Sequence, residues 1–169
     1  NERLILGTPL SDLLPHYQSN NGAIRPLVSA EDCFVAENTA ATDGYADIVT
    51  LTAINLDSQS ITSSVCLNVN VQGIYSSTSG FYVGGSSREP WFDFSNLTAV
   101  HKFSLNDGLL EYKASGAVPG YLGWNEPSFR MSEFNDELRI VTTNFQGDNS
   151  FPVHQLTILK ENGSYQFET

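Results

Sequence analysis

Few side chains in this sequence have a type and spacing that could support catalysis. His16, His101 and His154 lack the spacing of metal ligands. His101 and His154 stand near the starts of two similar segments, which predicts a structural role. The sequence has no Gly-x-Ser-x-Gly motif, and neither of its cysteines has a recognisable histidine partner. Nucleophilic catalysis therefore has no local support.

Carboxylates are more numerous, with 19 Asp and Glu against 8 Lys and Arg. Asp43 and Asp47 form the most acidic loop and are the candidate calcium ligands, since calcium prefers carboxylate oxygens. The spacing is not that of an EF-hand, and we expect no other cofactor. Converging carboxylates could also serve as general acid and base, so a hydrolase or lyase, with or without calcium, is the alternative to a non-enzymatic function.

Aromatic side chains in two connecting segments are the candidate binding residues. Trp91 and Phe92 lie in the loop 88–94, and Tyr121 and Trp124 lie in the segment 119–124. Loops between strands often carry the residues that contact partners, so these rings predict a contact surface for a protein or a surface polymer. For Tyr121 and Trp124 the alternative is a turn that locks one structural unit onto the next by burying the rings.

Cys33 and Cys66 are the only cysteines. They have neither the paired spacing of a zinc site nor a Cys-x-x-Cys redox motif. In an oxidising compartment they would form a disulfide, and otherwise they would remain two partly buried thiols.

The charge pattern excludes several partners. The formal net charge is −11, and the eight basic residues are scattered, so no patch exists to neutralise the phosphates of a nucleic acid. No apolar run approaches the roughly 18 residues of a membrane-spanning helix, so we expect no membrane insertion. The chain begins with Asn1 rather than Met, which indicates a processed or excised chain.

The elements that must position these residues are short strands. Residues 1–45 predict an irregular lead-in, with one helical turn from Ser11, as N-cap, to Leu14. From residue 46 onward β-branched and aromatic segments alternate with turns. The predicted strands cover 48–56, 61–67, 73–77, 81–83, 99–105, 109–114, 128–132, 138–143, 153–159 and 164–167.

The strands repeat in hairpins of two alternating kinds. Corresponding strand ends at Leu56, Leu105 and Leu159 lie 49 and 54 positions apart, a period of about 50 that suits a four-stranded unit. We therefore predict an all-β fold of antiparallel four-stranded blades, part of a β-propeller with about two and a half blades: an outer half-blade at 46–70 and blades at 71–118 and 119–169. A β-sandwich is the alternative. Propellers typically have four to eight blades, so we expect either a fragment of a longer protein or a chain whose exposed blade faces pair with another chain, with self-association as one such pairing.

Three segments carry a family resemblance, namely 103–108, 114–122 and 129–143, whose sequences are FSLNDG, ASGAVPGYL and FRMSEFNDELRIVTT. In order and spacing they resemble the central signature of a family of secreted bacterial and archaeal proteins with a β-propeller domain distantly related to WD40 repeats. The segments 13–15, 26–28, 32–33 and 50–56 resemble those that precede the signature. The resemblance implies a propeller fold and a secreted or periplasmic location, and it supplies no catalytic residues. We therefore expect a non-enzymatic binding or scaffold module.

Overall fold

The computed structural model of the chain describes residues 7–35, 48–86, 97–123, 125–144 and 151–169. Within these ranges the fold is all-β, as predicted, with one short α-helix, α2 (Leu10–Leu13), and two 3₁₀ turns, η1 (Ala30–Asp32) and η2 (Pro127–Arg130). The strands are β1 (His16–Tyr17), β2 (Arg25–Pro26), β3 (Cys33–Phe34), β4 (Val49–Asn55), β5 (Ser60–Leu67), β6 (Asn70–Ser76), β7 (Phe81–Ser86), β8 (Leu97–Asn106), β9 (Leu109–Pro119), β10 (Met131–Phe134), β11 (Glu137–Asn144), β12 (Val153–Glu161) and β13 (Phe167–Glu168).

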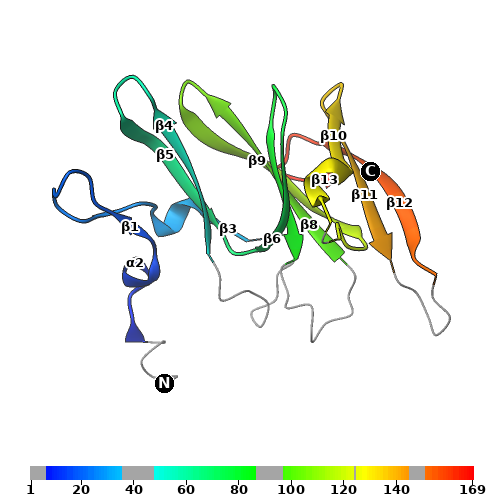
Figure 1. Cartoon of the computed structure of the whole chain (residues 1–169), viewed down its shortest axis with the longest axis horizontal. Coiled ribbons are helices and arrows are strands. Elements are labelled where there is room, and N and C mark those ends of the chain that lie inside the picture. The colour runs from blue at the N-terminus through cyan, green and yellow to red at the C-terminus, as the bar shows by residue number, and fades with distance from the viewer. Residues whose placement is uncertain (1–6, 36–47, 87–96, 124, 145–150) are drawn as a thin grey trace.

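Three sheets follow one another along the chain and lie side by side (Figure 1). The first contains β3, β5 and β4 in that order, the second β6 to β9 and the third β10 to β13, and a small pair, β1 and β2, precedes them. The second and third sheets are antiparallel four-stranded meanders, because each strand pairs with the next in sequence. This arrangement confirms the prediction of partial propeller blades.

β8 shows why the sheets must stack. From Thr98 to Ser104 its residues are buried on both faces, and Val100 and Phe103 are fully inaccessible to solvent. A strand that is buried on both faces needs a covering layer on each. The first and third sheets supply these layers.

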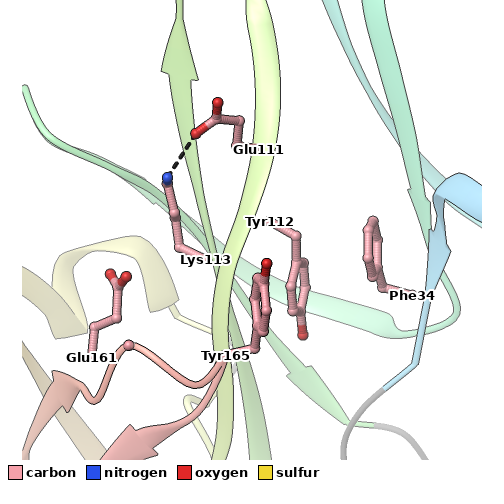
Figure 2. Close-up of a pocket in the computed structure, with 7 residues that line it drawn as sticks. Phe34, Glu111, Tyr112, Lys113, Glu161 and Tyr165 are labelled. Atoms are coloured by element: carbon pink, nitrogen blue, oxygen red, sulfur yellow. Dashed lines mark hydrogen bonds and ion pairs between the residues drawn. The ribbon is translucent and has the colours of Figure 1, made fainter.

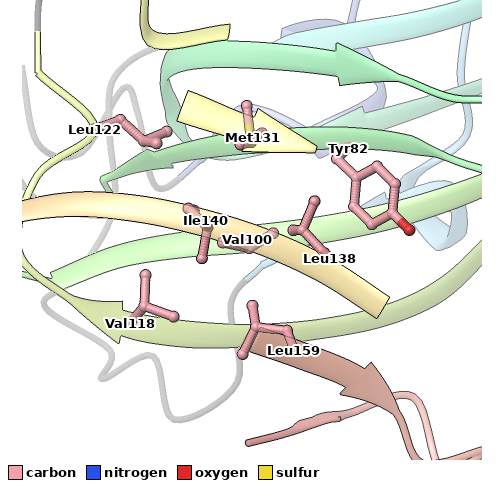
Figure 3. Close-up of a cluster of buried hydrophobic side chains, with 8 residues drawn as sticks. All are labelled: Tyr82, Val100, Val118, Leu122, Met131, Leu138, Ile140 and Leu159. Carbon is pink, nitrogen blue, oxygen red and sulfur yellow. The ribbon is translucent and has the colours of Figure 1, made fainter. Parts of the chain in front are cut away.

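Two apolar clusters join the three sheets. One lies between the second and third sheets (Figure 3) and contains Tyr82, Val100, Val118, Leu122, Met131, Leu138, Ile140 and Leu159. The other lies between the first and second sheets and contains Val65, Leu67, Val69, Val83 and Phe103. The second sheet therefore has a separate apolar cluster on each of its faces.

A polar junction reinforces the contact between the second and third sheets. The carboxylate of Glu133 in β10 accepts hydrogen bonds from Ser77, at 2.9 Å, and from Ser79 and Tyr82. Partial burial raises the pKa of the Glu133 carboxyl, but the hydrogen bonds from Ser79, Tyr82 and Ser77 outweigh it and lower the pKa. Nearby, the buried Lys102 of β8 pairs with Glu161 of β12 at 3.2 Å. Both contacts tie strands of different sheets.

The main chain also connects these two sheets. Tyr121 exchanges two backbone hydrogen bonds of 2.8 Å with Thr143 of β11. Gly120 allows this turn because its φ is +92° and an added Cβ would meet the carbonyl oxygen of Thr143 at 2.9 Å. The neighbouring Leu122 is fully buried in the cluster between the sheets.

Several local predictions were wrong at their ends. Residues 128–130, predicted as strand, belong to the 3₁₀ turn η2, because Pro127 occupies its first turn after Glu126 adopts a left-handed φ of +49°. Residues 164–166, also predicted as strand, form a bend with a single bridge at Gln166, because Tyr165 has a left-handed φ of +62°. Ser11 is not an N-cap, since α2 begins at Leu10 after Pro9.

The described part of the lead-in, residues 7–35, contains short elements between its loops. Besides α2, β1 and β2 it contains β3, which pairs in parallel with β5 and thereby becomes a strand of the first sheet. Leu14 and Val28 of the lead-in pack on Cys66 and cover one face of that sheet.

The opposite end of the stack presents an apolar face on the third sheet. Phe134, Leu156 and Ile158 there are 55%, 59% and 45% exposed. Self-association through such faces stays a prediction. In the described ranges no helix is long and apolar enough to cross a membrane.

The cluster between the second and third sheets gives a stability prediction. Leu138→Ala should lower the free energy of unfolding by about 2–5 kcal/mol, because it leaves a cavity at a fully buried site. Leu156→Ala is the matched control on the exposed face and should change that free energy by no more than about 0.5 kcal/mol. Urea unfolding of both variants measures the difference. Equal losses would contradict the predicted core.

Candidate functional site

An open groove of about 840 Å³ lies where the outer strand of the second sheet meets parts of the first and third sheets. We call it the aromatic groove (Figure 2). It brings together residues that are far apart in sequence. Its lining residues are Phe34, Glu111, Tyr112, Lys113, Glu161, Gly163 and Tyr165.

Two stacked rings form one wall of the aromatic groove. Phe34 and Tyr112 lie with their ring centroids 4.2 Å apart and their planes 7° from parallel. The fully buried Phe103 meets both rings edge-on, with its centroid 6.3 Å from that of Phe34 and 5.2 Å from that of Tyr112. Such offset and edge-to-face contacts are favourable for aromatic side chains. The wall is therefore held from behind by the core.

A β-bulge explains how three consecutive residues of β9 line one groove. Side chains normally alternate between the faces of a strand. The pairing of β8 with β9 shifts register between Lys102 and Phe103, so no residue of β8 lies opposite Lys113. A bulge redirects the side chains around it. Glu111, Tyr112 and Lys113 can thus all reach the aromatic groove.

The charged groups of the aromatic groove neutralise one another. Lys113 Nζ donates to Glu111 Oε2 at 2.6 Å, and this hydrogen bond lowers the pKa of Glu111 and raises the pKa of Lys113. The second carboxylate, Glu161, is paired with Lys102. Neither carboxylate of the lining stands without a positive partner.

Tyr165 belongs to the turn between β12 and β13, lines the aromatic groove and is 66% exposed. Its backbone carbonyl accepts a hydrogen bond of 3.0 Å from the N–H of Ser115, and the next residue, Gln166, forms a parallel bridge to Ser115. Asn162 Oδ1 accepts a hydrogen bond of 2.8 Å from the N–H of Ser164 inside the turn. The main chain that carries the Tyr165 ring is therefore anchored to β9.

A buried histidine supports Tyr112. The Nδ1 of His101 lies 3.1 Å from the hydroxyl oxygen of Tyr112. Burial lowers the pKa of His101 from 6.5 to about 4, because the charged form would lose its hydration. His101 is thus neutral at physiological pH and positions the tyrosine.

The position of Phe34, the other ring of the wall, is tied to the two cysteines. Cys33 and Cys66 form a disulfide that joins paired residues of the parallel strands β3 and β5, with Cα atoms 4.4 Å apart. Phe34 follows Cys33 directly, and its carbonyl accepts a hydrogen bond of 3.2 Å from the N–H of Asn68. Because β3 has only two residues, the disulfide adds a covalent tie that helps to hold Phe34 against Tyr112.

Of the binding residues predicted from sequence, Tyr121 is the one that the structure describes, and it does not line the aromatic groove. Tyr121 is half-buried, and its backbone rather than its ring locks the second sheet to the third. Trp91, Phe92, Trp124, Asp43 and Asp47 lie outside the described residues, so binding by the aromatic residues and calcium binding stay predictions. In the part of the chain that the structure describes, no three His, Cys, Asp or Glu side chains gather closely enough to hold a metal ion.

Sequence reasoning did not find the aromatic groove. Phe34, Tyr112 and Tyr165 come from three different sheets, and no local pattern links them. One signal was present: Glu111 to Lys113 places charged residues on both sides of a tyrosine in an outer strand.

Comparison with known proteins adds one finding. A family model described as a beta propeller domain matches residues 2–166, nearly the whole chain. No curated protein matches the chain.

Acid should destabilise the chain through His101. Because the pKa is about 4 in the folded state and 6.5 in the unfolded state, the unfolded state takes up the proton first. The stabilisation is present above pH 6.5 and is lost as the pH falls toward 4, at up to about 1.4 kcal/mol per pH unit. Urea unfolding across this range should show a flatter profile for His101→Gln, whereas the exposed His16→Gln keeps the original slope. An unchanged slope in His101→Gln would contradict this role.

Loss of the disulfide should weaken the chain and loosen the wall of the aromatic groove. The double variant Cys33→Ser, Cys66→Ser should lose about 2–4 kcal/mol of unfolding free energy, since the bond closes a loop with a sequence separation of 33. Reduction of the native protein should give the same loss. NMR of the aromatic protons should show Phe34 and Tyr112 moving apart. A ring contact that survives in the double variant would show that the disulfide does not position Phe34.

Proposed function

The chain belongs to the β-propeller domain family, and we propose that it is a non-enzymatic binding module that holds a neutral, hydroxyl-rich surface polymer in the aromatic groove. The aromatic groove itself is the observation that carries this proposal. It is open along the surface, and it combines aromatic rings with hydrogen-bonding side chains. Binding sites commonly combine apolar walls with a few polar groups that fix orientation.

The pairing of charges supports a neutral ligand. A polycation would need free carboxylates, but Glu111 and Glu161 are already paired with Lys113 and Lys102. Breaking those pairs would cost most at Lys102, which is buried. A ligand without charge leaves both pairs intact.

Sugar rings suit both kinds of surface in the aromatic groove. The faces of many sugar rings present C–H groups, which can lie against aromatic side chains such as Tyr112 and Tyr165. Their hydroxyl groups can donate to Glu111 and accept from Lys113. A polysaccharide is therefore the polymer class that we propose.

We also propose that the module works outside the cytoplasm, in a secreted or periplasmic location. The Cys33–Cys66 disulfide supports this location, because disulfides persist in oxidising compartments and are rare in the cytosol. The net charge of −11 favours solubility, because like-charged molecules repel one another.

Binding to defined oligosaccharides tests the proposal. We expect cellohexaose or chitohexaose to shift the ring resonances of Tyr112 and Tyr165 in NMR titrations. Tyr165→Ala should weaken binding about tenfold, which corresponds to about 1.4 kcal/mol for the loss of an exposed ring. Phe129→Ala, which removes another exposed ring outside the aromatic groove, is the matched control and should bind normally.

Two results would overturn the proposal. The first is that neither oligosaccharide binds, or that hexalysine binds at the same residues and more tightly. The second is that chromatography detects shortened oligosaccharides after incubation, because release of shorter products would favour the hydrolase or lyase alternative.

A further inference from the structure

A second groove, of about 520 Å³, lies between β5 and the lead-in. We call it the edge groove. It is separate from the aromatic groove, with no lining residue in common. Residues 61–64 of β5 line one side, and the lead-in contributes Tyr17, Arg25, Ser29 and Asp32 to the other.

The lining shows that the edge groove follows the backbone of β5 rather than one of its faces. Four consecutive residues, 61–64, contribute to it. The bulge at Thr62 redirects the side chains next to it, but Ser63 and Ser64 follow it in regular register and point to opposite faces, so a groove over one face would not meet both. A groove that meets all four runs along the edge of the strand.

The backbone of β5 faces this edge with open hydrogen-bonding groups. The N–H of Asn68 donates to the carbonyl of Phe34, so it points toward the side where β3 pairs. The backbone groups of Ser64, four residues earlier, point to the same side, because the direction alternates with a period of two. β3 reaches only Cys66 and Leu67, and within the described ranges no strand pairs with this edge at Ser64.

Two segments of the chain already occupy outer edges of this kind. β3 pairs in parallel with β5, and Gln166 makes a parallel bridge to Ser115 of β9, the outer strand of the second sheet. β3 does so as a two-residue strand and Gln166 through a single bridge, so each outer edge already accepts backbone from another segment. The edge at Ser64 lies on the same side of β5 as β3, next to η1, whose last residue, Asp32, leads into β3.

The ends of the edge groove favour an extended peptide with mixed polar side chains. Arg25 is exposed on the lead-in side and contributes a positively charged side chain. Ser29 caps the start of η1, and Asp32 is its last residue. The register shift between Ala53 and Ile54 places a bulge in β5 at Thr62, which limits regular pairing to a few residues. The site therefore suits a short strand.

We propose that the edge groove binds an extended peptide segment of a partner protein, which adds to β5 at Ser64 as a parallel strand between β5 and the lead-in. Main-chain hydrogen bonds to β5 would supply affinity, and the side chains of Arg25 and Tyr17 would select the sequence, as in other complexes formed by strand addition. The site is independent of the polymer-binding function proposed for the aromatic groove.

A synthetic peptide tests this site. The probe is an acetylated, amidated hexapeptide with the sequence Thr-Val-Thr-Val-Glu-Thr, whose Glu can pair with Arg25. With the full ¹⁵N-labelled chain and 1 mM probe, we expect slower hydrogen exchange at the amide of Ser64 and unchanged exchange at Ser63, which faces β4. Two probes N-methylated at alternate backbone nitrogens provide a control on the peptide: one should lose binding at least tenfold, and the other should keep it.

Protein variants test the same geometry. Ser64→Pro removes the N–H that faces the open edge, so it should fold, as proline is tolerated on edge strands, and should lose the probe. Arg25→Ala should weaken binding of the probe but not of its Gln-containing analogue. No protection of Ser64 at 1 mM probe, or equal binding of both N-methylated probes, would overturn the proposal. If protection of the Ser64 amide rises with protein concentration in the absence of the probe, the occupant of the edge groove is a second copy of the chain. That result would also overturn the proposal of a partner peptide.

Discussion

The structure depends on one constraint: the second sheet has two apolar faces, and both must be shielded from water. β8 is buried on both sides, so the second sheet needs a neighbour in each direction. The third sheet meets one face through Leu138, Ile140 and Leu159, and the first sheet meets the other through Val65 and Leu67. Burial of apolar area between the sheets is the dominant favourable contribution to the free energy of folding, and the hairpins place the apolar side chains where they can be buried.

The polar contacts between sheets work inside this apolar frame and extend to the surface. Lys102 is buried next to the cluster, and it neutralises Glu161 at the edge of the aromatic groove. His101, in the same strand, lies within hydrogen-bond distance of the hydroxyl of Tyr112. The properties of the aromatic groove are therefore set by β8, a strand that does not line it.

The sequence predicted what depends on local pattern. The β-branched segments at 48–56, 99–105 and 138–143 became β4, β8 and β11, and the period of about 50 corresponds to the successive sheets. The prediction of strand ends failed where a left-handed backbone conformation sets them. Glu126 and Tyr165 have such conformations, and the two strands predicted near them begin later than expected. Sequence reasoning also missed β3 and the aromatic groove, because a two-residue parallel pairing and a contact between Phe34 and Tyr112 leave no periodic trace.

The turn at Tyr121 has a consequence for how this fold tolerates sequence change. The bonds that it forms with Thr143, and those between Ser115 and Tyr165, run from backbone to backbone. A backbone hydrogen bond does not depend on which side chain the residue carries, provided that the local conformation is allowed. These two joints between neighbouring sheets can therefore persist while the surface residues around them diverge, so the fold can acquire new specificities without losing the alignment of its sheets.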